Sequence, residues 1–304
     1  MDCYKRTSQP RTSGHDKLCA VRREERSEII YIAGCSHSGT TLLDLLLSTH
    51  PGVCGLGEAR MLIEDDRRPE YTSNADERIC SCGDPINHCP LWSRFLDRIE
   101  ETSSGGFGER YATLIDLVHS VVGPDVVVSD SSKYIGPLRR LIAALRDGDL
   151  ADTDPDDLLV VHLVKDVRAF ATSMKYRHDL APWSLAKQFY KWYTANQKIS
   201  TFLDDENIAS VQVTYEQLCF HTDAVLSRIF VVAGLVPSET TGDRSTTKAH
   251  VGLGNPMRTH DQKAQSIVYD SRWFHEPLVQ GLYYLLPGVR SYNRAVGAPG
   301  LHNR

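Results

Sequence analysis

The chain has 304 residues, of which 41% are hydrophobic and 24% are charged, and its formal net charge at pH 7 is −5. This composition is that of a globular protein able to bury a core, and the acidic balance differs from the strong basic excess of a general nucleic-acid binder. No apolar run approaches the roughly 20 residues that span a bilayer, so we expect neither a nucleic-acid partner nor a membrane partner.

Residues 1–27 carry many charged side chains and no apolar segment of the kind found in secretory signals. The sequence therefore predicts a flexible N-terminal arm at 1–27, followed by a single domain at 28–304. The eight cysteines, in a chain without a recognisable secretion signal, indicate reduced thiols and a cytoplasmic protein rather than a disulfide scaffold.

Strand and helix patterns alternate along the chain. Apolar runs predict strands, and apolar residues at helical spacing predict helices. The predicted strands are 29–33, 126–129, 158–164 and 209–215, and the predicted helices are 40–48, 136–146, 167–179, 184–203, 222–234 and 276–286. This alternation predicts an α/β protein with a mainly parallel central sheet flanked by helices. Residues 65–107 have only weak periodicity, and we interpret them as an insertion or lid.

A glycine-rich turn, GCSHSGTT at 34–41, follows the first predicted strand. It fits the phosphate-binding pattern G-x-x-x-x-G-K-[ST] except at the lysine, where Thr40 stands. Backbone N–H groups at the start of the next helix, with the hydroxyl groups of Ser38, Thr40 and Thr41, suit one compact anionic group. The turn therefore favours a 5′-phosphate or phosphosulfate over a triphosphate with magnesium, and a tight turn without any ligand is the alternative.

The longer segment GCSHSGTTLL resembles the phosphosulfate loop of sulfotransferases that use 3′-phosphoadenosine-5′-phosphosulfate (PAPS), often written G-x-x-[RK]-S-G-T-[TS]-L-L. The resemblance implies a P-loop-like sulfotransferase architecture. It also implies that the donor is bound by Ser36, His37, Ser38, Gly39, Thr40 and Thr41. His37 departs from the pattern, because the family usually has arginine or lysine there.

A second segment, VVHLVKDVRAFATS at 160–173, resembles the 3′-phosphate site of the same family, in which a basic residue ends a strand and a serine follows eight residues later. The matching residues are Lys165 and Ser173. A basic first helical turn without a ligand is the alternative. The late segment HVGLGNPMR, at 250–258, resembles a loop that closes over the 3′-phosphate and contributes Arg258.

The resemblance implies transfer of a sulfuryl group from PAPS to a hydroxyl group of a small-molecule, glycan or natural-product acceptor, without a required metal. Glu58 is the candidate base, because many family members carry an acidic residue at this position. His37 is a rival base or a group that stabilises the sulfuryl oxygens. Lys133, in the segment DSSK, is the candidate cation for the leaving phosphate.

Two other functions fit parts of the sequence. A P-loop nucleotide kinase or NTPase would share the glycine-rich turn, but it normally has the lysine that Thr40 replaces. A non-catalytic nucleotide-binding relative would explain the departures at His37 and Lys165, where the family more often has arginine.

The segment RICSCGDPINHCPLW contains three cysteines and a histidine within ten residues, namely Cys80, Cys82, His88 and Cys89. Three thiolates and an imidazole could hold a tetrahedral zinc ion, although the C-x-C spacing is not the usual C-x2-C. Free or packed thiols, a structural zinc site and a disulfide are therefore all compatible with the sequence.

Overall fold

The computed structural model describes residues 26–64, 68–102, 105–150, 153–237, 249–255 and 267–297. The predicted N-terminal arm, apart from its last two residues, lies outside these ranges, as does Arg258. None of the helices in the described ranges is both long and apolar enough to cross a membrane.

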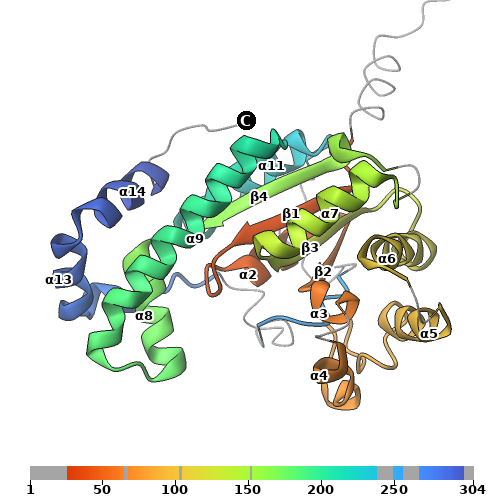
Figure 1. Ribbon diagram of the computed structural model, residues 1–304, viewed down its shortest axis with the longest axis horizontal. Coiled ribbons are helices and arrows are strands. Elements are labelled where there is room, and N and C mark those ends of the chain that lie inside the picture. The colour runs from red at the N-terminus through yellow and green to blue at the C-terminus, as the bar shows by residue number, and fades with distance from the viewer. Residues whose placement is uncertain are drawn as a thin grey trace, which may run out of the picture.

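Five parallel strands form a central sheet in the order β2-β3-β1-β4-β5 (Figure 1). The strands are β1 (Ile29–Gly34), β2 (Val53–Gly57), β3 (Val127–Lys133), β4 (Leu158–Val164) and β5 (Ser210–Thr214). The four strands predicted by residue range are all present, and β3 extends further than expected because it includes the polar residues Asp130 to Lys133. The predicted fold class, α/β with a mainly parallel sheet, is confirmed.

Helices cover both faces of this sheet. They are α2 (Thr40–Leu47), α3 (Arg60–Ile63), α4 (Arg68–Thr72), α5 (Trp92–Thr102), α6 (Phe107–Val121), α7 (Ile135–Asp147), α8 (Val167–His178), α9 (Leu185–Glu206), α10 (Tyr215–Phe220), α11 (Thr222–Val232), α13 (Pro277–Leu285) and α14 (Pro287–Gly297). The six predicted helices correspond to α2, α7, α8, α9, α11 and α13, whereas α3, α4, α5, α6, α10 and α14 were not predicted.

The side chains of β1 alternate between the two helical layers. Ile29 and Tyr31 share a core cluster with residues of α6 and α7, and Ile30 and Ile32 share another with residues of α2 and α11. Figure 1 shows α7 and α9 lying across one face of the sheet. Because both faces are covered, β1 and β4 are apolar almost throughout.

The segment interpreted as an insertion or lid contains α4, α5 and the cysteine-bearing loop. Its apolar residues Ile86, Trp92 and Phe95 are buried in the same cluster as Ile29 and Tyr31. The part of this segment that the structure describes is thus packed into the main core through its apolar side chains.

Gly34, at the end of β1, is paired with Leu163 of β4. A Cβ atom at position 34 would lie 2.6 Å from the backbone oxygen of Leu163. Because both atoms belong to the central sheet, we expect Gly34→Ala to lower the free energy of unfolding by roughly 1–3 kcal/mol, measured by urea unfolding.

The matched control is Gly281→Ala, at an exposed position inside α13, where an added Cβ would meet no atom within 4 Å. This variant should be neutral or stabilised by up to about 1 kcal/mol, because alanine favours helix more than glycine does. Equal stability of the two variants would show that the sheet does not constrain Gly34.

Candidate active site

A pocket of about 730 Å³ lies beyond the carboxyl ends of the strands, where open parallel sheets bind their ligands. Each strand of the sheet ends at or just before at least one residue of the pocket wall. These wall residues are Ser36 and His37 after β1, Glu58 after β2, Lys133 in β3, Lys165 after β4 and Tyr215 after β5. The sheet thus brings together residues that are far apart in the sequence.

The turn between β1 and α2 forms one wall of this pocket. Gly39 has φ 97°, a left-handed conformation that favours glycine, and a Cβ there would lie 2.7 Å from the Tyr215 ring. No side chain of the described residues caps α2, and its first turn contains no acidic residue. Thr40 and Thr41 line the pocket. The start of α2 therefore offers N–H groups and two hydroxyl groups to an anion.

The two serines of the turn have different surroundings. Ser36 lines the pocket, and its Oγ is 2.6 Å from the hydroxyl of Tyr134. Ser38 is buried and does not line the pocket. Its N–H donates to the carbonyl of Cys35, and its Oγ has no hydrogen-bond partner among the described residues. Of the two hydroxyl groups, only that of Ser36 belongs to a residue of the pocket wall.

Glu58 and Lys133, two of the predicted catalytic residues, form an ion pair on the pocket wall. The Oε1 atom of Glu58 is 2.6 Å from Nζ of Lys133, and its Oε2 atom is 3.7 Å from a guanidinium nitrogen of Arg60. Glu58 is 6% exposed and Lys133 is 9% exposed. Each carboxylate oxygen thus faces a cation, and both charges of the pair are largely shielded from water.

His37, the rival base, is surrounded by positive charge. Its ring lies 5.7 Å from that of His178, centroid to centroid, in an edge-on arrangement. Burial, followed by the charges of Lys133, Arg177, His178 and Lys165, lowers the pKa of His37 to about 4. The ring is therefore neutral at pH 7 in this structure. It does not supply the positive charge that the family resemblance implies for this position.

Lys165 and Ser173 face the same pocket as the glycine-rich turn. Lys165 is 4% exposed, and its Nζ lies 3.7 Å from Asp270 and 4.4 Å from the centre of the Tyr215 ring. Burial lowers the pKa of Lys165, and the nearby carboxylates of Asp270 and Glu216 oppose this shift. The two segments that resemble donor-binding motifs therefore meet in one pocket.

Three arginines of the pocket wall were not predicted as site residues: Arg60, Arg177 and Arg272. Arg177 had a usable signal, because it lies one helical turn after Ser173 and so on the same face of α8. Arg272 had no such signal, because it is far from the motif residues in sequence and reaches the pocket only through the packing of the folded chain. Arg168, next to the motif in sequence, does not line the pocket: it donates two side-chain hydrogen bonds to Asp166.

The described part of the predicted closing loop lies beside the glycine-rich turn. Gly254 and Asn255 line the pocket, and the N–H of Asn255 is 3.4 Å from Oγ1 of Thr41. A Cβ on Gly254 would lie 3.3 Å from the same Thr41 atom and 3.9 Å from Oε1 of Glu58. This loop thus contacts the end of the pocket where the candidate catalytic residues lie.

Two buried carboxyl groups support this end of the sheet. Asp44 of α2 accepts hydrogen bonds from the N–H of Gly57 and from the hydroxyl groups of Ser129 and Ser131. Burial raises the pKa of Asp44 to about 7. Asp44 therefore joins α2 to the ends of β2 and β3, immediately before Glu58 and Lys133.

The second carboxyl group, Asp130 of β3, accepts hydrogen bonds from Ser132 and from the Tyr111 hydroxyl. Burial raises its pKa to about 6. The polar residues of the DSSK segment before Lys133 are thus hydrogen-bonded inside the protein. Lys133, at the end of the segment, lines the pocket.

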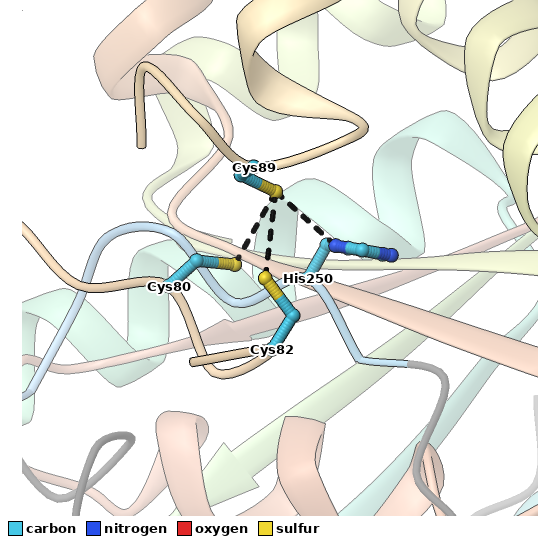
Figure 2. Close-up of side chains that lie close together, drawn as sticks. All are labelled: Cys80, Cys82, Cys89 and His250. Atoms are coloured by element: carbon cyan, nitrogen blue, oxygen red, sulfur yellow. Dashed lines mark hydrogen bonds between the residues drawn. The ribbon is translucent and has the colours of Figure 1, made fainter. Parts of the chain in front are cut away.

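The structure corrects the fourth member of the cysteine cluster. His88 is exposed and does not belong to it. The residue that joins Cys80, Cys82 and Cys89 is His250, from a distant segment of the chain (Figure 2). No signal in the sequence connects His250 to the cysteines, whereas proximity in sequence favoured His88.

Among solved structures, the chain is similar to the sulfotransferase domain from the Synechococcus PCC 7002 olefin synthase, with 21% identity and a TM-score of 0.55 over 88% of this chain and 95% of that chain. It also matches a sulfotransferase from Alicyclobacillus acidocaldarius, with 16% identity and a TM-score of 0.46 over 89% of this chain and 95% of that one. No protein-family model and no curated protein matches the sequence. The first likeness confirms the predicted sulfotransferase fold.

The raised pKa of Asp44 predicts a pH-dependent stability. A pKa raised from 3.8 to about 7 means that the folded state binds the proton more tightly than the unfolded chain. The stability that this proton contributes is fully present below pH 3.8 and is lost as the pH rises through about 7. We therefore expect Asp44→Asn, which stays neutral, to become more stable relative to wild type as the pH rises, by up to about 1.4 kcal/mol per pH unit.

Thermal or urea unfolding at several pH values measures this difference. Asp116→Asn, at an exposed position of α6, is the control and should follow the wild-type pH dependence. Parallel curves for wild type and Asp44→Asn would contradict the raised pKa of the Asp44 carboxyl group.

Proposed function

We propose that this protein is a PAPS-dependent sulfotransferase that transfers a sulfuryl group to a hydroxyl group of a small-molecule, glycan or natural-product acceptor. The observation that carries the proposal is the meeting of two anion-binding motifs, the turn at 34–41 and the pair Lys165 and Ser173, in one pocket. PAPS carries anionic groups on both its 5′ and 3′ positions, so it needs two such sites.

The charge of the pocket wall supports an anionic donor. Among the residues that the structure describes, the wall holds the cations Arg60, Lys133, Lys165, Arg177 and Arg272 and the carboxylates Glu58 and Asp270. In this assignment, the start of α2 and the hydroxyl groups of Thr40 and Thr41 bind the 5′-phosphosulfate, and Lys165 and Ser173 bind the 3′-phosphate. Each charge-assisted hydrogen bond of this kind contributes roughly 1.5–3 kcal/mol.

Glu58 acts as the general base in the proposed reaction. The acceptor oxygen forms a bond to sulfur, the bond between sulfur and the 5′-phosphate oxygen breaks, and the acceptor proton passes to Glu58. The products are a sulfate ester and adenosine 3′,5′-bisphosphate. His37 is the weaker candidate, because a ring whose pKa is lowered to about 4 holds a proton poorly at neutral pH.

The ion pair between Glu58 and Lys133 couples the two charge changes of this step. While Glu58 is ionised, its Oε1 lies 2.6 Å from Nζ of Lys133. Protonation of Glu58 removes that partner just as negative charge develops on the leaving phosphate. Lys133 can then direct its charge toward the phosphate, which stabilises the transition state more than the ground state.

The positions of the aspartates near the ends of the strands do not favour a P-loop nucleotide kinase or NTPase. Such an enzyme uses a strand-terminal aspartate to hold magnesium. Asp130 in β3 is bonded to Ser132 and Tyr111, and Asp166 after β4 is bonded to Arg168. Neither aspartate lines the pocket.

The assignment of Lys165 predicts a selective loss of affinity. Lys165→Met should weaken binding of adenosine 3′,5′-bisphosphate by roughly 10- to 100-fold, which corresponds to the loss of one charge-assisted contact. Binding of adenosine 5′-monophosphate, which lacks the 3′-phosphate, should change little. Isothermal titration calorimetry measures both affinities.

The control is Lys175→Met, because Lys175 lies on the neighbouring helix α8, is paired with Glu276 at 2.7 Å, and does not line the pocket. Its affinity for both nucleotides should equal that of wild type. An equal loss for both nucleotides in Lys165→Met would remove Lys165 from the 3′-phosphate site.

Glu58→Gln tests the base. We expect kcat for sulfuryl transfer from labelled PAPS, to an acceptor found in a panel of hydroxylated compounds, to fall by roughly 10²- to 10⁴-fold. Affinity for adenosine 3′,5′-bisphosphate should be kept, because the amide leaves Lys133 in place.

Glu64→Gln is the matched control, since Glu64 is also paired with Arg60, at 3.8 Å, but does not line the pocket. Its turnover should stay near that of wild type. Near-normal turnover in Glu58→Gln, with nucleotide binding intact, would exclude Glu58 as the base.

A further inference from the structure

Cys80, Cys82, Cys89 and His250 form a compact cluster away from the pocket wall (Figure 2). Their ligand atoms, the three sulfur atoms and one imidazole nitrogen, all lie within 4.8 Å of one another. Figure 2 shows that these side chains point toward a common centre from two separate segments of the chain. Cys80, Cys89 and His250 are buried, whereas Cys82 is exposed.

The two sulfur–sulfur distances measured from Cys89 match those of a tetrahedral zinc site, and its distance to His250 is somewhat shorter than in such a site. With Zn–S bonds of about 2.3 Å and a Zn–N bond of about 2.05 Å, the ligand atoms of a tetrahedron lie about 3.8 Å apart for two sulfurs and about 3.6 Å apart for sulfur and nitrogen. The sulfur of Cys89 lies 3.7 Å from those of Cys80 and Cys82 and 3.2 Å from Nδ1 of His250.

A disulfide does not account for this geometry. The sulfur–sulfur distances of 3.7 Å are far longer than the roughly 2.05 Å of a disulfide bond, and the three cysteines are free thiols in the structure. A disulfide would also use only two of the three sulfurs and would leave the imidazole of His250 without a role.

Backbone groups around the cluster are arranged as they are around metal-bound thiolates. The amides of Leu91 and Trp92 are hydrogen-bonded to the sulfur of Cys89, and the amide of Asp84 to that of Cys82. Such N–H groups offset the negative charge of thiolates and fix their direction, as outer-shell partners of metal ligands do.

The segment that carries His250 is also held in place from several sides. The indole Nε1 of Trp92 donates to the carbonyl of His250 at 2.6 Å, and the N–H of His250 donates to Gly55 of β2 at 2.8 Å. Ser81, between two of the cysteines, donates to the carbonyl of Ala249 and accepts from the N–H of Val251. The backbone around His250 is therefore held by hydrogen bonds both to β2 and to the cysteine-bearing segment.

We propose that Cys80, Cys82, Cys89 and His250 bind one Zn²⁺ ion as a structural site. Mononuclear tetrahedral sites with three thiolates and one imidazole are typical of zinc. All four coordination positions are occupied by side chains, which leaves none for a catalytic water. Binding releases the three thiol protons and produces a complex with a net charge of −1.

The site links the cysteine loop to the segment at 249–255, and the end of this segment reaches the pocket wall. Leu253 bridges to Gly57, and the N–H of Glu58 donates to the carbonyl of Leu253 at 3.1 Å. Gly254 and Asn255 then reach the pocket wall beside Thr41. The zinc ion thus fixes the loop against which the candidate base is held.

Metal analysis of the full chain, purified without chelator under reducing conditions, tests the proposal. We expect about one zinc per chain by mass spectrometry, and intense thiolate charge-transfer bands after replacement by cobalt(II). Near-zero zinc, both as purified and after addition of zinc to the reduced protein, would overturn the proposal. This readout does not depend on nucleotide binding or sulfuryl transfer, so it stands apart from the proposed function.

The two histidines provide a matched pair of variants. His250→Ala should lose most of the zinc, whereas His88→Ala, at an exposed position six residues after Cys82, should keep about one per chain. Cys82→Ser, which alters the exposed ligand, should also weaken zinc binding. It tests the ligand set even if His250→Ala does not fold. Zinc retained in folded Cys82→Ser and His250→Ala, or lost in His88→Ala alone, would contradict the ligand set.

Hydrogen exchange tests the structural role. Removal of zinc by a chelator should increase exchange at the amides of His250 and Val251, which are bonded to Gly55 and Ser81, and should leave the amides of β1 protected. Unchanged exchange at 249–255 after complete loss of zinc would show that the ion does not hold this loop.

Discussion

The fold gathers several positively charged side chains in one pocket, and the rest of the site depends on this concentration of charge. Lys133 and Lys165 are less than 10% exposed, so water screens their repulsion only weakly. The effect on a neighbour is visible at His37, whose pKa is lowered to about 4 by burial and by surrounding cations. The carboxylates of Glu58 and Asp270 offset part of this charge. The proposed polyanionic donor would neutralise the remaining excess of cations, although the whole chain has a net charge of −5.

The sheet and its buried carboxyl groups hold this charge in place. Asp44 joins α2 to the ends of β2 and β3, and β3 ends at Lys133 in the left-handed conformation, with φ 67°. The glycine-rich turn, Glu58 and Lys133 are therefore fixed relative to one another by hydrogen bonds that do not involve a ligand. A preorganised site of this kind loses little free energy to rearrangement when charge develops in a reaction.

Much of this architecture could be predicted from local patterns. The apolar run Leu158–Val164 is β4 with the same bounds, and the turn at 34–41 precedes α2 as its glycine pattern indicates. Local patterns could not predict which distant side chains would meet. Arg272 reaches the pocket, and His250 reaches the cysteines, through long-range packing that has no periodic signal in the sequence.

The departures from the family pattern have physical meaning in the structure. The neutral ring of His37 leaves the glycine-rich turn without the charge that the resemblance implies, while Arg177, one turn after Ser173, supplies a charge to the same pocket wall. The pocket wall therefore carries positive charge at positions other than those that the sulfotransferase motifs imply. A comparison of single motif residues would suggest a weakened site, whereas the described residues of the wall together include more cations than carboxylates.

The most direct test of the central claim is calorimetric titration of the wild-type protein with adenosine 3′,5′-bisphosphate and, separately, with ATP and magnesium. We expect the bisphosphate to bind without magnesium and more tightly than magnesium-bound ATP. Tight, magnesium-dependent binding of ATP, with no binding of the bisphosphate, would contradict the claim that the pocket is built for a donor with anionic groups at both ends.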